Sequence, residues 1–201
     1  MKKTGFEFGA GALLFLLALY SLGDTRNMAA VLLPILAHEA GHLLAFWLLG
    51  LPLRRFRIEL RGLCIEYGGA PGPFSLAFAA SAGPLAGLIY AFVCSRCGNR
   101  LNSDWLCLTA GVSLLLSVFN LLPALPLDGG TLLNCLCTPL FGERTAGKLC
   151  EVSGILVSAC LLGLGFHRML HGSGIGLVLA AIWLLLSQED GQGLVKRREI
   201  I

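Results

Sequence analysis

The feature that most constrains the fold is a series of apolar blocks, each long enough to cross a lipid bilayer. A helix needs about 20 predominantly apolar residues for that crossing. We predict six such spans, at about residues 8–23, 28–50, 74–94, 104–123, 149–170 and 174–187. Only 13% of the 201 residues are charged, too few to cover the outside of a water-soluble fold. The sequence therefore predicts an all-α polytopic membrane protein, multi-pass in the cell membrane.

The positions of the basic residues predict how these spans are oriented. Of the 15 Lys and Arg residues, 11 fall on the side of the predicted membrane that carries the N-terminus, and the other four are Arg26, Arg96, Arg100 and Arg168. Since basic loops stay in the cytoplasm, both termini are expected to be cytoplasmic, in a bacterial plasma membrane. The basic residues are too scattered for a nucleic-acid surface, so the expected surroundings are the lipid bilayer and no nucleic acid.

The segment between the second and third spans, residues 51–73, has a different pattern. Residues 56–60 and 63–67 alternate apolar with charged or small side chains, and Gly62 lies between them. This pattern predicts a short β-hairpin at the membrane interface or in a protein-lined cavity, because unpaired strand amides are not tolerated in lipid. An exposed strand edge there can pair with an extended peptide.

The second predicted span contains the sequence His38-Glu39-Ala40-Gly41-His42. In a helix, residues four apart lie on one face, so both imidazoles can reach one metal ion, and zinc suits them. Glu39 is near enough to act as a general base on a water molecule at the metal. A single histidine in an apolar helix is usually a packed residue. Ionisable groups at bilayer depth cost at least about 2.5 kcal/mol each, which favours a functional role for the three together.

A zinc hydrolase needs a third protein ligand and leaves the fourth position to water. Asp128 is the candidate, because Pro123 and Pro126 break the fourth span just before it and two glycines follow it. Broken backbone at membrane depth is tolerated only where it lines a protein cavity. The alternative is that Asp128 caps a helix at the interface.

Other candidate groups are weaker. His167 and His171 are also four residues apart, but no acid lies between them, and we interpret them as interfacial. Cys94 and Cys97 form a lone CxxC without the second pair that a structural zinc site requires.

These residues resemble the site-two protease family of intramembrane zinc metalloproteases. The matching segments are residues 38–42 for HExGH, 119–129 for NxxPxxPxDG, 81–87 for AGPxxN and the Gly68-Gly69 pair. The resemblance implies that His38, His42 and Asp128 bind Zn²⁺ and that Glu39 is the general base. It also implies that Asn120 helps to hold the substrate or the oxyanion. Gly87 departs from the pattern, since many members have Asn there, so a polar contact at this position is absent or replaced.

The sequence therefore predicts one membrane-embedded metalloprotease domain over residues 1–201, with its core at about residues 28–137. Its layout is closest to the sporulation-type branch, which implies regulated proteolysis of membrane-tethered proteins near the cytoplasmic side. Regulatory membrane proteins are the expected partners besides the substrate. Three alternatives stay open: a metal transporter with the same site, a catalytically inactive relative that binds membrane proteins, and a protease whose third ligand is Glu143 or Glu151.

Overall fold

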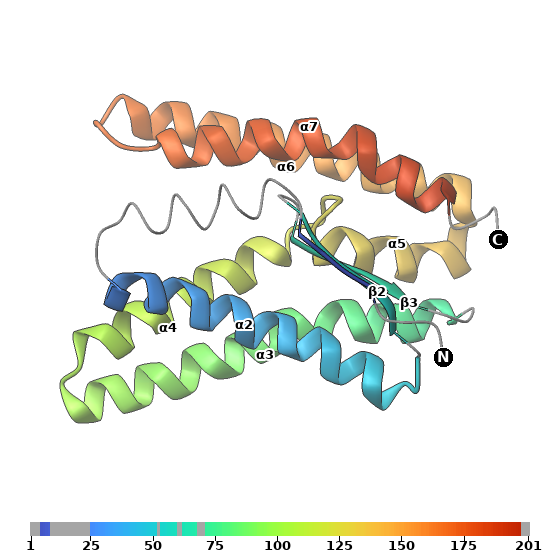
Figure 1. Ribbon diagram of the computed structural model, residues 1–201. Helices are drawn as coiled ribbons and strands as arrows, with labels where there is room; N and C mark the ends of the chain where they lie inside the picture. Colours follow the sequence, from blue (N-terminus) through green and yellow to red (C-terminus); the bar gives the residue numbers. More distant parts are fainter. Residues whose placement is uncertain (1–4, 9–24, 52, 60–61, 68–70, 198–201) are drawn as a thin grey trace. The chain divides into compact units, whose positions relative to one another are not determined.

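The computed structural model describes residues 5–8, 25–51, 53–59, 62–67 and 71–197. The elements are β1 (Gly5–Phe8), α2 (Thr25–Leu48), β2 (Leu53–Glu59), β3 (Gly62–Tyr67), α3 (Pro73–Leu101), α4 (Asp104–Asn120), α5 (Asp128–Phe141), α6 (Glu143–Met169) and α7 (Ile175–Arg197) (Figure 1). They form two compact units, which meet in sequence between Phe119 and Asn120. The predicted single domain crosses this boundary and stays a prediction.

In the first unit, α2 packs against α3 along much of its length. The approach is close at Gly41, where a Cβ would collide with the backbone oxygen of Ala82 and lie 2.7 Å from the Cβ of Ala86. In lipid, where apolar side chains gain little by leaving their surroundings, small residues drive such packing because they let backbones approach. The glycine of the HExGH element therefore brings its helix against α3.

The helices α3 and α4 form an antiparallel pair joined by a tight turn. Asn102 ends α3 in a left-handed conformation (φ 48°), and its N–H donates to the carbonyl of Gly98. Further along the pair, the Ser113 hydroxyl donates to the carbonyl of Gly87 over 2.8 Å. A polar contact thus does exist at Gly87, and α4 supplies it in place of a side chain at that position. Interhelical hydrogen bonds of this kind stabilise helix pairs in membranes.

A three-stranded sheet, in the order β1-β2-β3, belongs to the same unit. Strands β2 and β3 pair antiparallel in the segment where the sequence predicts a hairpin, while residues 60–61 between them and Gly68-Gly69 lie outside the described residues. Strand β1 pairs in parallel with β2, with Phe6 opposite Phe56. The sequence analysis did not anticipate β1, because four residues are too few to show an alternating pattern.

The second unit consists of α5, α6 and α7. The prolines end the fourth predicted span early, so α4 stops at Asn120 and a separate helix, α5, begins at Asp128. Helix α5 packs on α6, and α6 packs on α7. The turn between α6 and α7 contains Gly172 (φ 77°) and Gly174 (φ 114°), a conformation that glycine adopts without a steric cost.

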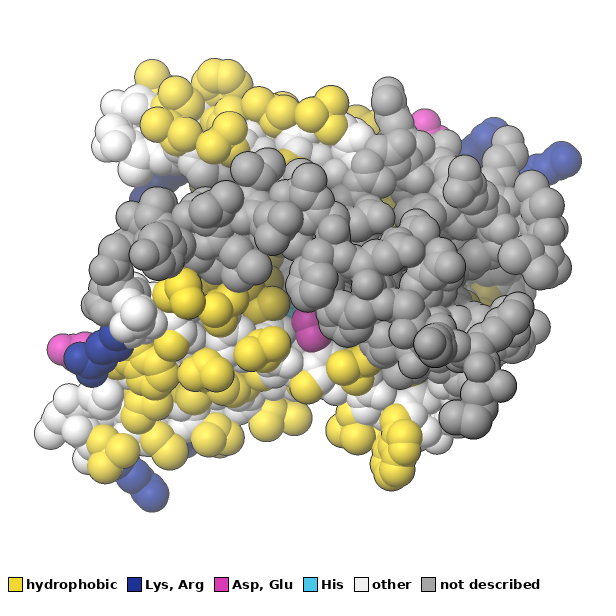
Figure 2. All heavy atoms as spheres, viewed as in Figure 1, with side chains coloured by type: hydrophobic (Ala, Val, Ile, Leu, Met, Phe, Trp, Pro, Cys, Tyr) yellow, Lys and Arg dark blue, Asp and Glu magenta, His cyan; other side chains and the backbone are white. Residues whose placement is uncertain are grey.

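Membrane-spanning length is confirmed for three of the six predicted spans. Among the described residues, α2, α3 and α6 are long and apolar enough to cross a bilayer, whereas α4 and the stretch Ile175–Ser187 are apolar but shorter. The first predicted span lies outside the described residues except for Phe8. Large hydrophobic side chains cover much of the outside of the helices, as Figure 2 shows for one face. Such an exterior suits lipid and not water.

Candidate metal centre

His38 and His42 meet edge to face on α2, one turn apart. Their ring centroids are 5.0 Å apart with an interplanar angle of 78°, and their Nε2 atoms are 3.3 Å apart. His38 is almost fully buried, with 4% of its surface exposed, and His42 is half-buried. The pair is therefore held away from bulk solvent with two ring nitrogens facing each other.

A carbonyl on the neighbouring helix selects which nitrogen of His42 can bind a metal. The Nδ1 atom of His42 lies 2.8 Å from the carbonyl oxygen of Ala79 on α3. Because a carbonyl only accepts hydrogen bonds, Nδ1 is the protonated nitrogen, and in the neutral ring the lone pair is on Nε2. Metal-binding histidines commonly donate their second ring N–H in this way. Sequence reasoning missed Ala79, since a backbone carbonyl leaves no signal in residue type.

The spacing of the two nitrogens fits zinc. Two nitrogens that each lie about 2.0–2.1 Å from a tetrahedral zinc ion are about 3.3 Å apart. The two Nε2 atoms are separated by this distance. Imidazole nitrogen is also a preferred ligand type for zinc, so the residues present support Zn²⁺ as the cofactor.

Gly83 on α3 makes room for the ring of His42. A Cβ at this position would collide with the Nε2 atom of His42 and lie 2.6 Å from two of its ring carbons. Any side chain at residue 83 would thus displace the imidazole. This contact gives a physical role to the Ala82-Gly83-Pro84 part of the AGPxxN element.

Glu39 lies on α2 between the two histidines in sequence and is half-buried. It follows His38 directly, so the helix turns it about 100° away from the face that carries the imidazoles. A carboxylate there lies beside the metal-binding face without being part of it.

Asp128 is the first residue of α5, in the second unit, and is half-buried. Its carboxylate thus stands at the N-terminal end of α5, which is the positive end of the helix dipole. The next residue, Gly129, packs so tightly that a Cβ would lie 2.5 Å from the carbonyl oxygen of Leu122. Asn120 is the last residue of α4 and the first of the second unit. Both residues stay predictions as site residues.

The other acidic and histidine candidates lie at exposed positions of α6 and the turn after it. Glu143 begins α6 and Glu151 lies within it, both exposed. The rings of His167 and His171 approach to 5.3 Å, and both side chains are exposed. None of these four shares the buried setting of His38.

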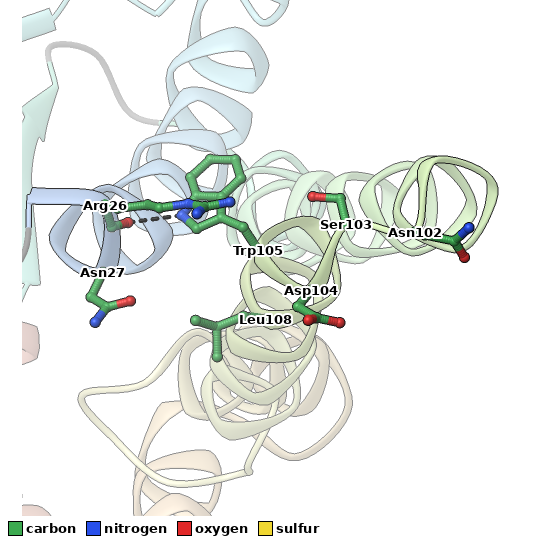
Figure 3. A pocket seen from close by; sticks show the side chains of 7 residues that line it. All are labelled: Arg26, Asn27, Asn102, Ser103, Asp104, Trp105 and Leu108. Atoms are coloured by element: carbon green, nitrogen blue, oxygen red, sulfur yellow. Dashed lines mark hydrogen bonds between the residues drawn. The ribbon is translucent and has the colours of Figure 1, made fainter.

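A pocket of about 720 Å³ lies at the N-terminal end of α2 (Figure 3). Its lining residues are Arg26, Asn27, Asn102, Ser103, Asp104, Trp105 and Leu108. The indole N–H of Trp105 donates to the carbonyl of Arg26 over 2.8 Å, which ties the start of α4 to the start of α2. No predicted site residue lines it, so it is separate from the candidate metal centre.

Comparisons with known proteins bear on the family. The family model described as Peptidase M50B-like matches residues 10–138, which include every predicted site residue. Rip3 of Mycobacterium tuberculosis, a candidate zinc metalloprotease, is 31% identical in an alignment of 178 residues that covers 82% of this chain and 44% of Rip3. The candidate zinc metalloprotease sll0528 of Synechocystis is 28% identical over 121 residues, 57% of this chain and 32% of that protein. The chain thus spans less than half the length of these two relatives.

A solved structure shares the fold. The site-2 protease from Methanocaldococcus jannaschii matches with a TM-score of 0.71 and 21% identity, over 95% of this chain and 93% of that chain. The family model alone covers well over half of the sequence. This membrane protein therefore belongs to the peptidase M50B-like family, the site-two protease family that its HExGH and NxxPxxPxDG elements resemble.

Proposed function

We propose that this chain is an intramembrane zinc metalloprotease that hydrolyses peptide bonds of membrane-tethered proteins near the cytoplasmic side. The observation that carries the proposal is the buried histidine pair, with its two Nε2 atoms 3.3 Å apart and Nδ1 of His42 bound to a carbonyl. Family membership and the names of the two relatives support the same reaction.

The proposed zinc ligands are Nε2 of His38, Nε2 of His42 and the carboxylate of Asp128. Three protein ligands leave the fourth position open, as a hydrolytic site requires. When bound, zinc supplies a Lewis acid that polarises a peptide carbonyl and lowers the pKa of water. The alternative third ligands, Glu143 and Glu151, are both exposed on α6, whereas Asp128 is half-buried.

Glu39 is the proposed general base. Its carboxylate takes a proton from the attacking water and then delivers it to the leaving amine, which converts a poor leaving group into a neutral one. Asn120 is proposed to donate its side-chain amide to the oxygen on which negative charge develops. Glu39 and Asn120 both lie within the part of the chain that the family model matches.

The substrate is proposed to bind as an extended strand. A peptide bond inside a helix is shielded by its own hydrogen bonds, so the substrate segment has to unwind before cleavage. Within the described residues, strand β3 is at one edge of the sheet, where an extended peptide can add as a further strand. The excess of basic residues on the side of the N-terminus supports cytoplasmic termini. We also propose that cleavage is regulated and that partner membrane proteins control it.

The test compares purified wild type with Glu39→Gln, Asp128→Ala and Glu151→Gln, the last being a matched control at an exposed glutamate. Bound zinc is measured by elemental analysis, and cleavage is measured on a membrane-tethered reporter in proteoliposomes. We expect about one zinc per chain in all but Asp128→Ala. Cleavage should persist only in wild type and Glu151→Gln.

The alternatives predict other outcomes. Cleavage by Glu39→Gln at the wild-type rate contradicts the proposed general base. Loss of zinc in Glu151→Gln, with zinc kept in Asp128→Ala, identifies Glu151 as the third ligand. Zinc flux into liposomes that Glu39→Gln leaves unchanged, without cleavage by wild type, favours a transporter. Bound zinc with neither cleavage nor flux favours an inactive relative.

A further inference from the structure

We propose that Ser153, on α6, is a positioning residue that fixes the loop carrying Asp128 and thereby sets the affinity for zinc. The inference rests on the proposed function, in which Asp128 is a ligand. The hydroxyl of Ser153 donates to the carbonyl oxygen of Pro123 over 2.6 Å, across 30 residues of sequence. Both residues belong to the second unit, so the contact lies within one compact body.

The loop between α4 and α5 depends on such a contact because its own hydrogen bonding is sparse. Pro123 and Pro126 have no N–H group, and neither can extend a helical ladder. Two short-range backbone bonds are found within the loop, from Ala124 to Leu122 (2.8 Å) and from Leu127 to Ala124 (2.9 Å). Neither of them uses the carbonyl of Pro123. The hydroxyl of Ser153 supplies a hydrogen-bond donor for that carbonyl.

The hydroxyl of Ser153 has a second neighbour, the carbonyl of Cys150 on its own helix, at 3.0 Å. Since a hydroxyl has one proton, the shorter contact to Pro123 is the stronger bond. A serine that bonded only to its own helix would have no reason to affect another segment. The 2.6 Å contact links α6 to the loop between α4 and α5, which leads into Asp128.

Helix α6 has a further contact on the other side of Asp128. The thiol of Cys150, which is 2% exposed, lies 3.7 Å from the carbonyl of Gly130 and donates to it. Cys150 and Ser153 are three residues apart, so they lie on the same face of α6. This face therefore contacts the chain five residues before Asp128 and two residues after it. Attachment on both sides restricts how the first turn of α5 can rotate.

Restricted rotation matters because metal ligands tolerate little displacement. Binding sites have to hold their ligands within about 0.5 Å of the productive geometry. Loss of a group that orients a ligand typically lowers metal affinity 10- to 100-fold. Since Ser153 bonds to the chain five residues before Asp128 and not to the carboxylate itself, we expect the lower end, a rise of about 10-fold in the zinc dissociation constant on Ser153→Ala.

The experiment uses the full chain in detergent, with zinc affinity measured by competition against a chromophoric chelator. Visible absorption of the Co²⁺-loaded protein reports ligand geometry independently of activity. The variants are Ser153→Ala, Ser153→Val, the hydroxyl-retaining Ser153→Thr, and Thr138→Val as a matched control. Thr138 donates to the carbonyl of Asn134 within α5, so its loss removes a hydroxyl bond of the same unit that touches no loop. We expect weaker zinc binding and an altered Co²⁺ spectrum for Ser153→Ala and Ser153→Val, and wild-type behaviour for Ser153→Thr and Thr138→Val.

Thermal unfolding of the metal-free proteins distinguishes a specific effect on the position of Asp128 from a general loss of stability. Ser153→Ala and Thr138→Val each lose one hydrogen bond and should lose similar stability, while only the first loses affinity. Wild-type affinity and spectrum in Ser153→Ala overturn the inference. The isosteric pair Ser153→Thr and Ser153→Val differs only in the hydroxyl, so equal zinc affinity in this pair overturns it even where Ser153→Ala fails to fold. Zinc binding by Asp128→Ala at wild-type strength contradicts the proposed ligand set instead.

Discussion

Replacement of Gly83 by Ala should abolish tight zinc binding although residue 83 is no metal ligand. The methyl group would occupy the space that the imidazole of His42 fills, 2.6 Å from two ring carbons. Ordinary van der Waals contact begins at 3.4 Å, so the ring or the helix has to give way by at least about 0.8 Å. The ring cannot move that far and keep the 2.8 Å bond from its Nδ1 to the carbonyl of Ala79.

The expected loss of zinc affinity follows from how little displacement of its ligands a zinc site tolerates. Zinc–nitrogen distances vary by only about 0.2 Å, at most a quarter of the displacement that the methyl group requires. The remaining option is for α3 to retreat from α2, and overpacking of this kind costs about 1–3 kcal/mol. We therefore expect the zinc dissociation constant to rise at least about 100-fold. The unfolding temperature of the metal-free protein should fall by about 2–12 °C, which corresponds to that cost.

Chelator competition measures the affinity, and circular dichroism on heating measures the stability. Gly111→Ala on α4 is the matched control, because a Cβ at that position would meet nothing within 4 Å. That variant should bind zinc like wild type and gain up to about 1 kcal/mol, since alanine favours the helix more than glycine does. Wild-type affinity in Gly83→Ala would show that the imidazole of His42 is not seated against α3, and the argument would fail.

Two further predictions concern the same helices. Gly87→Ala should destabilise the protein by about 1–3 kcal/mol because its Cβ would collide with Oγ of Ser117, and Ser117→Ala in the same chain should recover part of the loss; additive effects in thermal unfolding would contradict that contact. Removal of zinc with a chelator should lower the unfolding temperature of wild type and Glu39→Gln alike, by the equivalent of about 2.7 kcal/mol at a free zinc concentration 100 times the dissociation constant. Asp128→Ala should show a much smaller decrease, and an equal decrease would exclude Asp128 as a ligand.

The sequence by itself determined the membrane class, the family and the histidine pair. Each of these depends on short-range regularities: long apolar blocks, and a four-residue spacing that any α-helix converts into neighbouring side chains. The sequence also predicted the helix break before Asp128, because proline cannot continue a helix in any surroundings. The structure accordingly begins α5 at Asp128.

Tertiary structure decided which backbone group His42 contacts and which helix binds the loop between α4 and α5. The carbonyl of Ala79 is 37 residues from His42 in sequence, and Ser153 is 30 residues from Pro123. Strand β1 likewise finds its partner some 50 residues away, with Phe6 opposite Phe56. Hydrophobic periodicity records which face of an element is buried, but not which distant backbone group it meets. Such contacts follow only from the packing of whole elements against one another.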